Sequence, residues 1–293
     1  MRNALHASGG RLVMGPLLGM IPLLLPVSGA DCVSDAVDNA VDEVVAGIVE
    51  QNTGGTVVEE PEGDRPTSDG DAGTGESGVG PHIETDGLVV VEAEHYSWAR
   101  PNWFEMLGQQ VELDNRRWYV QDGGASGPGP DPDGFHTGAS GDAYLECLPD
   151  TRVTHSDPIE DGSLYGEGEG GASLDYEIEF QTAGTYYVWV RAYSTGTEDN
   201  GIHVGLDGEL PETGRKIQLC GQNEWRWTNA QRGSGGSACG VTGTITITVW
   251  NPGPHTVTFH QREDGHEFDR FLLTTDPGYG PTGEGPAESP TRF

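Results

Sequence analysis

SLDYEIEF, residues 173–180, and GTYYVWVRAYS, residues 184–194, predict two β-strands that follow one another along the chain. In the second strand, Val188 and Val190 alternate with Trp189 and other large side chains. Side chains on a strand point alternately to its two faces, so such a run is typical of a sheet that covers a core. Because Trp189 lies in the middle of this strand, we expect it in the core.

Similar runs lie on both sides of this pair, separated by turn-forming residues. They occupy residues 88–96, 117–121, 142–148, 201–208, 216–220, 244–250, 255–263 and 268–275. No long helical pattern separates them, which excludes a βαβ arrangement. The predicted fold class is therefore all-β, an antiparallel β-sandwich or jelly roll.

The composition is acidic and rich in glycine. The 293 residues include 46 glycines and 19 prolines, and the formal net charge is −32. Glycine and proline at this frequency favour a β-rich core with substantial loops. Charge of this sign argues against nucleic acid and anionic membranes as partners, and it favours cations or neutral partners.

Residues 1–30 have the features of a signal peptide. Arg2 and Arg11 supply its positive region, residues 12–27 its apolar core, and residues 28–30 a small-residue cleavage site. The apolar core is shorter than the roughly 20 residues of a membrane-spanning helix. We therefore expect a secreted, extracellular or cell-surface protein with no membrane insertion after cleavage. A retained N-terminal anchor is the alternative.

Residues 31–52 predict a short amphipathic helix. Ser34 is a suitable N-cap, and valines recur at helical spacing through residues 34–51. This segment is either a helix for self-association or a marginal helix that frays. Residues 53–86 predict a disordered acidic linker, and residues 277–293 predict a Gly/Pro-rich tail.

Export would make the four cysteines candidates for disulfides. Cys220 and Cys239 bracket a polar loop, and we predict that they pair. A disulfide between Cys32 and Cys147 is then the remaining pairing, by arithmetic alone. In either pair the cysteines could instead be free.

Three segments, taken in order, resemble the galactose-binding-like β-sandwiches. They are VEAEHYS at residues 91–97, the stretch at residues 175–208, and PGPHTVTFHQREDGHEFDRFLLT at residues 252–274. Within that group they resemble carbohydrate-binding modules of families six and thirty-five, over residues 87–276. The resemblance implies a sandwich that binds a polysaccharide or glycan.

Two carboxylates follow the apolar start of the first strand in VVVEAEHYSW, residues 89–98. Glu92 and Glu94 are two positions apart, about 7 Å along a strand and on one face. In the modules that this chain resembles, these two positions and an Asp of the last strand hold a structural calcium ion, which implies Glu92, Glu94 and Asp269 here. Calcium prefers about 6 to 8 oxygen ligands, so the ion would join the first strand to the last.

The calcium reading has an alternative that involves no metal. In it, Glu94 is exposed at the end of the strand, and Glu92 pairs with Arg270 or Arg191.

Four tryptophans are candidates for binding a sugar. Trp225 and Trp227 alternate with charged residues, so on a strand both rings face one way. Trp98 and Trp103 follow the first strand, in a loop that approaches the same end of the sandwich in the modules that the chain resembles. Sugars have apolar C–H faces that stack on flat rings. For Trp225 and Trp227, packing in the core is the alternative.

Polar candidates for the same ligand lie in two other places. Glu198, Asp199 and Asn200 occupy the loop at residues 195–201, where they could bind hydroxyls or a second cation; a simple turn is the alternative. Glu267 takes a position where the family-six modules often carry an Asn that contacts sugar. The chain departs from the family pattern there.

Signatures of catalysis are weak. The sequence has no Gly-x-Ser-x-Gly elbow and no phosphate-binding glycine loop. We therefore predict a secreted, non-catalytic carbohydrate-binding protein with a structural calcium ion. The alternatives are a surface or matrix adhesion protein that self-associates through its N-terminal helix, and a jelly-roll polysaccharide lyase or glycosidase.

Overall fold

A computed structural model describes part of the chain. The described residues are 75–76, 79–106, 109–113, 115–124, 131–153, 162–233, 241–242 and 244–292. They all belong to the second of two compact units, Pro66–Phe293. The predicted signal peptide, the helix at residues 31–52 and most of the linker lie outside them and stay predictions. Within the described part, no helix has the length and apolarity needed to cross a bilayer.

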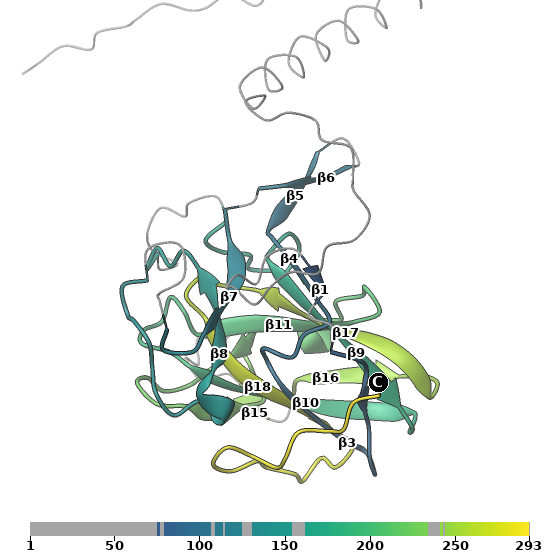
Figure 1. Ribbon diagram of the computed structural model, residues 1–293. Helices are drawn as coiled ribbons and strands as arrows, with labels where there is room; N and C mark the ends of the chain where they lie inside the picture. The colour runs from purple at the N-terminus through teal and green to yellow at the C-terminus, as the bar shows by residue number, and fades with distance from the viewer. Residues whose placement is uncertain are drawn as a thin grey trace, which may run out of the picture. The chain divides into compact units, whose positions relative to one another are not determined.

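One sheet of the sandwich, sheet A, has nine strands (Figure 1). Eight of them follow the order β1 (Gly75–Glu76), β4 (Trp98–Arg100), β9 (Ser173–Phe180), β17 (Gly253–Gln261), β11 (Gly201–Leu206), β12 (Ile217–Gln218), β14 (Ala230–Gln231) and β15 (Val241–Thr242). The ninth, β2 (His82–Ile83), runs parallel to β9.

The other sheet, sheet B, has seven strands. Its main path is β13 (Arg226–Thr228), β10 (Gly184–Tyr193), β18 (Glu267–Thr274), β8 (Tyr144–Leu148) and β7 (Arg117–Gln121), while β16 (Thr246–Val249) also pairs with β10, and β3 (Leu88–Glu92) with β18. A separate hairpin is formed by β5 (Trp103–Met106) and β6 (Gln109–Glu112), and the short 3₁₀ helices are η1 (Ser140–Asp142) and η2 (Glu212–Gly214). The predicted all-β, mainly antiparallel sandwich is confirmed.

The core lies between the facing sides of the two sheets. Tyr176 and Phe259 of sheet A contact Phe271 of sheet B, with ring centroids 4.8 Å apart in each pair. Val188 and Val190 of β10 are fully buried in the same cluster. Trp189, between these two valines, points to the opposite side and is half-buried. The prediction that Trp189 lies in the core is therefore wrong, because its position in the alternation differs from that of the valines.

The sandwich begins earlier than predicted: the sequence places its first residue at 87, but the strand at residues 82–83 already belongs to it. Strand β2 joins sheet A, and Glu84 behind it is only 1% exposed. The Glu84 carboxylate accepts hydrogen bonds from the backbone N–H of Gly87 at 2.6 Å and Gln181 at 2.6 Å, and from the Tyr186 hydroxyl at 3.0 Å. Part of the predicted acidic linker is therefore a fixed corner of the fold.

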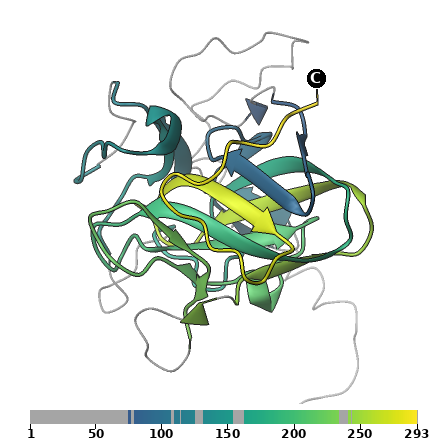
Figure 2. The same cartoon turned by 90° about the horizontal axis from the view of Figure 1, so that it is seen from below.

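The C-terminal segment also packs on the sandwich. We call residues 281–292 the C-terminal strap; Figures 1 and 2 show it in yellow. Ser289 exchanges two hydrogen bonds with Val90 of β3, at 2.8 and 3.0 Å, and the Ile83 N–H donates to the Pro290 carbonyl at 2.8 Å. The tail predicted from the Gly/Pro composition is therefore bound along β3, because it satisfies backbone groups that β18 leaves unpaired.

Candidate functional site

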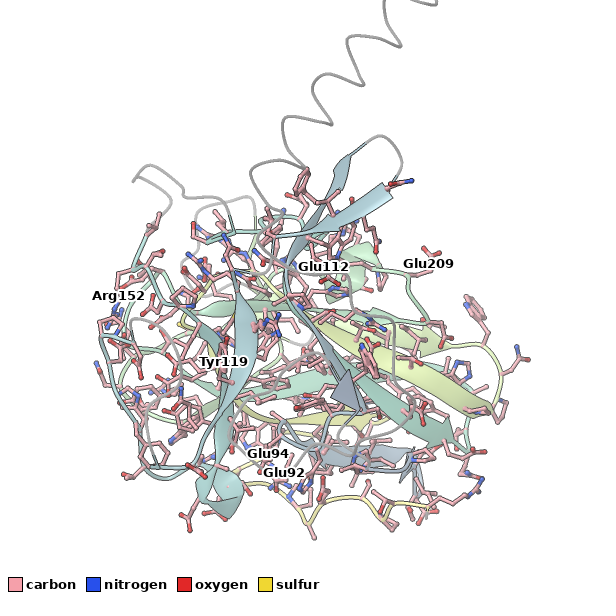
Figure 3. All side chains as sticks on the ribbon, turned by 45° about the horizontal axis from the view of Figure 1, so that its top comes forward. Glu92, Glu94, Glu112, Tyr119, Arg152 and Glu209 are labelled. Atoms are coloured by element: carbon pink, nitrogen blue, oxygen red, sulfur yellow. The ribbon has the colours of Figure 1, made fainter. Side chains whose placement is uncertain are left out.

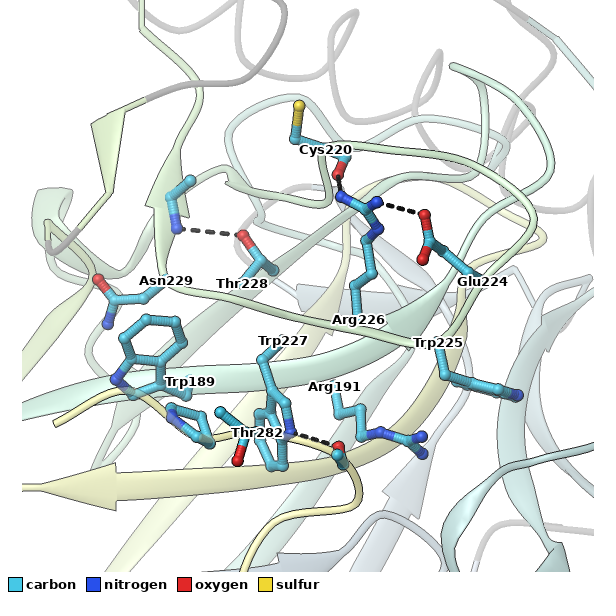
Figure 4. Close-up of a pocket in the computed structure, with 13 residues that line it drawn as sticks. Trp189, Arg191, Cys220, Glu224, Trp225, Arg226, Trp227, Thr228, Asn229 and Thr282 are labelled. Carbon is cyan, nitrogen blue, oxygen red and sulfur yellow. Dashed lines mark hydrogen bonds and ion pairs between the residues drawn. The ribbon is translucent and has the colours of Figure 1, made fainter.

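A pocket of about 680 Å³ lies on the outer face of sheet B (Figure 4). Its floor is formed by Trp189 and Arg191 of β10, which point away from the core valines. One wall comes from the segment 220–230 and the other from residues 281–283 of the strap. The pocket therefore joins three parts of the sequence that lie far apart.

Trp225 and Trp227 both line this pocket, so the two rings face one way, as their alternation predicts. Trp227 stands opposite Arg191 in the β13–β10 ladder. The indole N–H of Trp225 donates to the Thr137 carbonyl at 3.1 Å, and that of Trp227 donates to the Gly283 carbonyl at 3.0 Å. Both rings are half-buried, which leaves part of each indole open to the pocket.

Arg191 links the pocket to a buried group of acids. Its guanidinium lies 5.6 Å from the centre of the Trp225 ring, a cation–π distance. Its Nη1 is paired with Asp269, and its Nη2 donates to the Gly138 carbonyl at 3.2 Å. Asp269 is the extra residue of a β-bulge, because Arg191 pairs with Arg270 while the next residue of β10 pairs with Phe268.

The three predicted calcium ligands lie near one another. The Ser140 hydroxyl donates to Glu92 at 2.9 Å, and the Ser140 N–H donates to Asp269 at 2.8 Å. Glu94 follows the end of β3, and Figure 3 shows it beside Glu92. Glu92 also pairs with Arg270 at 2.9 Å, as the alternative without metal predicts, but Glu94 is half-buried, so that alternative is wrong in placing it exposed. Two of the three carboxylates therefore already have an arginine partner.

The pKa values of the carboxylates in this group are raised, so their charged forms are disfavoured. Burial, together with the charges of Glu92 and Asp269, raises the pKa of Glu94 to about 8. Burial also raises the pKa of Asp269, to about 6, against the opposing effect of Arg191. One oxygen each of Glu92 and Glu94 is buried without a hydrogen-bond partner. Among the residues that the structure describes, however, no three acidic, His or Cys side chains are close enough together to form a ready metal site.

Glu267 lies outside the pocket. It is 1% exposed, and its Oε1 is 2.8 Å from Nδ1 of His136, while its Oε2 is buried without a partner. Glu146 stands opposite it on β8, and burial together with the charge of Glu267 raises the pKa of Glu146 to about 10. This pair is a buried acidic site, and direct contact between Glu267 and a ligand in the pocket is not supported.

The acidic loop predicted to bind hydroxyls uses its side chains internally. Asp199 is fully buried and accepts the Thr195 N–H at 2.9 Å. Glu198 lies 3.0 Å from Arg152, and the Asn200 N–H donates to Glu263 at 3.0 Å. These contacts fit the alternative of a structural turn.

Trp98 and Trp103 do not line the pocket. Trp98 is 41% exposed on β4 in sheet A, and Trp103 belongs to the β5–β6 hairpin. Sequence reasoning missed Trp189, which the strand alternation could have assigned to the face of Arg191. It also missed the strap, for which the sequence offers no periodic signal.

The described part of the chain contains two of the four cysteines, Cys147 and Cys220. Cys147 is a fully buried free thiol, so the pairing with Cys32 left by arithmetic is wrong and the free alternative holds for it. Burial raises the pKa of this thiol well above its ordinary value. Cys239 lies outside the described residues, so the disulfide between Cys220 and Cys239 stays a prediction.

Comparison with known proteins gives one family and one curated relative. Residues 138–288 match the family described as "Glycosyl hydrolase family 115 C-terminal domain". "Uncharacterized protein P23" of Formosa agariphila is 44% identical over 207 residues, which make up 69% of this chain and 47% of that protein. The chain thus spans about half the length of this relative.

Comparison with solved structures gives matches that include family 35 carbohydrate binding modules. A family 35 carbohydrate binding module from Clostridium thermocellum is 11% identical and covers 64% of this chain and 96% of its own, with a TM-score of 0.32. A second, from Paenibacillus barcinonensis, is 13% identical and covers 64% and 99%, with a TM-score of 0.33. The GH26-CBM35 β-(1,4)-mannanase of Podospora anserina is 14% identical and covers 67% and 29%, with a TM-score of 0.34.

Proposed function

Because the chain belongs to the family of the glycosyl hydrolase family 115 C-terminal domain, we propose that it is a carbohydrate-binding β-sandwich that holds a glycan in the pocket on sheet B. The observation that carries this proposal is the lining of the pocket. Three tryptophans, Trp189, Trp225 and Trp227, surround it together with the polar side chains of Glu224 and Arg226.

This lining suits a sugar for a physical reason. A sugar ring has apolar C–H faces, which pack on indole rings, and a rim of hydroxyls, which need hydrogen-bond partners. Glu224 and Arg226 are both about half exposed and form an ion pair at the mouth of the pocket. They offer an acceptor and a donor to such hydroxyls.

The binding role that we propose is non-catalytic. Glycoside hydrolysis generally uses two carboxylates on opposite sides of the scissile bond. Of the pocket-lining residues in the described part of the chain, only Glu224 has a carboxylate. That carboxylate is paired with Arg226, and no second carboxylate lines the described part of the pocket.

The test is retention on polysaccharides. Wild-type protein should be slowed in native gels that contain at least one of five soluble polysaccharides: xylan, mannan, galactan, dextran and xanthan. Trp227→Ala should reduce the affinity roughly thirtyfold, as expected for a central aromatic contact. Trp250→Ala is the matched control, because Trp250 is 81% exposed and does not line the pocket. Release of reducing ends or unsaturated products from the retained polysaccharide would contradict the non-catalytic reading.

We also propose that calcium binds at Glu92, Glu94 and Asp269. The unpartnered buried oxygens of Glu92 and Glu94 support this, since a hard cation would supply their missing interaction. The ion would lower the repulsion among the three carboxylates and stabilise the contact between β3 and β18. Secretion, expected from residues 1–30, is part of the same proposal, because calcium and glycans are both abundant outside cells.

A further inference from the structure

The strap forms part of the pocket as well as covering β3. Pro281, Thr282 and Gly283 line the pocket opposite the segment that carries Glu224 (Figure 4). The Gly283 carbonyl accepts the indole N–H of Trp227 at 3.0 Å. The polar edge of Trp227 is therefore occupied by the strap, and only its ring surface is left for a ligand.

Close packing at Gly285 fixes the strap against the same indole. Gly285 has φ +87°, and a Cβ built there would lie 2.7 Å from Cζ2 of Trp227. Real Cβ atoms do not approach other atoms that closely, so any side chain at this position would push the strap away from the ring. The backbone and the indole are thus packed without space between them.

Arg270 holds the strap from beneath. It is 3% exposed, and its Nη1 donates to the Glu284 carbonyl at 2.6 Å. The far end is held at β3, where the Glu288 carboxylate accepts the Glu92 N–H at 3.0 Å and Ser289 bonds to Val90. The strap is therefore anchored at Glu284, between its two contacts with Trp227, and again at Glu288 and Ser289 on β3.

We propose that the strap is a specificity-determining wall of the glycan pocket, that it sets the orientation of Trp227, and that it contributes the Thr282 hydroxyl as a sugar contact. This rests on the proposed glycan-binding function. The bound sugar sits between two walls, with ring faces on the indoles and hydroxyls towards Thr282 and Glu224. Arg270 is a positioning residue, since it acts on the sugar only through the strap.

Hydrogen–deuterium exchange tests the wall directly. The probe is whichever of the five polysaccharides retains the wild-type protein, added at saturation to the full chain. Binding should slow exchange in two segments, residues 225–229 and residues 282–287. Protection of the first segment with unchanged exchange in the second would overturn the inference while leaving the proposed function intact. Retention by none of the five would contradict the proposed function itself, and this inference with it.

Variants of the strap give a second test. Gly285→Ala should weaken binding about tenfold or more, because the strap shifts from Trp227. Gly280→Ala is the matched control, since a Cβ there meets nothing within 4 Å, and it should bind like wild type. Trp227→Phe keeps an aromatic face but cannot donate to Gly283, and its affinity should lie between those of wild type and Trp227→Ala.

The melting temperature separates this role from a purely structural one. If Gly285→Ala melts like wild type and binds equally well, the strap is no part of the binding site. If it unfolds more easily, Trp227→Phe decides: wild-type affinity in that variant would overturn the inference, and reduced affinity at an unchanged melting temperature would support it.

Discussion

Glu84 and Glu94 are ten residues apart in the sequence, and their carboxylates have opposite surroundings: Glu84 is buried beside β2, whereas Glu94 is half-buried in the turn after β3. Glu84 accepts five hydrogen bonds, from Gly87, Gln181, Tyr186 and both the N–H and hydroxyl of Thr182. Burial alone would raise its pKa, but these donors outweigh burial and lower it. Glu94 has a buried oxygen with no partner, and its pKa is raised to about 8.

The difference shows that hydrogen-bond donors outweigh burial at Glu84, whereas at Glu94 burial outweighs the groups that favour the anion. At Glu84 the charge is stabilised by groups of the protein itself, so the residue has a structural role. At Glu94, burial and the charges of Glu92 and Asp269 raise the pKa, and they outweigh the two groups that favour the anion, its own backbone N–H and His95. A buried acid of that kind is where a cation from solution would bind most favourably.

Replacing Glu84 should have the largest effect on stability. In Glu84→Gln the carboxylate that joins the β2–β3 corner to the β9–β10 turn is lost, and an amide N–H₂ faces backbone N–H groups. Unsatisfied buried donors cost about 1–3 kcal/mol each, so we expect a loss of roughly 3 kcal/mol in the free energy of unfolding. Urea unfolding followed by tryptophan fluorescence at pH 7 measures it. A loss below about 1 kcal/mol would mean that the corner is not a fixed part of the fold.

The pH dependence of the same variant tests the lowered pKa. A carboxyl whose pKa is lower in the folded state stabilises the protein above its unfolded pKa, about 4.3 for Glu, and loses that contribution as the pH falls through the folded value. Wild type and Glu84→Gln should therefore differ most at pH 6–7, and the difference should shrink below about pH 4. Urea midpoints at pH 7, 5, 4 and 3 give this comparison. A constant gap down to pH 3 would show that the charge of Glu84 is not what stabilises the corner.

Calcium binding at the site of Glu94 should have an effect of intermediate size on stability. If the ion binds at Glu92, Glu94 and Asp269, calcium at about 100 times its dissociation constant should add about 2.7 kcal/mol to the free energy of unfolding. The melting temperature of wild type should rise with CaCl₂ and fall with EDTA. Glu94→Gln should lose this response, whereas Glu84→Gln should melt lower but still respond. An equal response in both variants would place calcium elsewhere or nowhere.

Much of the fold could be predicted from the sequence, but the corner and the strap could not. Strand β10 follows from local alternation, and so does the shared orientation of Trp225 and Trp227, whereas β9 and β18 follow from runs of strand-forming residues between turns. The buried position of Glu84 could not be predicted, because most of its hydrogen-bond donors lie about a hundred positions later in the sequence. From the sequence alone, Glu84 is one of several acidic residues in the predicted linker. The strap has no periodicity, because its bonds to β3 come from the backbone N–H of Ser289 and from two consecutive side chains, Glu288 and Ser289, which form no repeating pattern.

The smallest effect is expected at Glu167, which separates the role of donors from that of burial. Hydrogen bonds from Lys216 and Arg215 lower the pKa of Glu167, in the same direction as at Glu84. Its side chain, however, is 65% exposed, so water and salt screen both contacts. Glu167→Gln should therefore leave the melting temperature unchanged within error at physiological salt. A decrease as large as that in Glu84→Gln would show that donors suffice without burial, and the contrast between Glu84 and Glu94 would then need another cause.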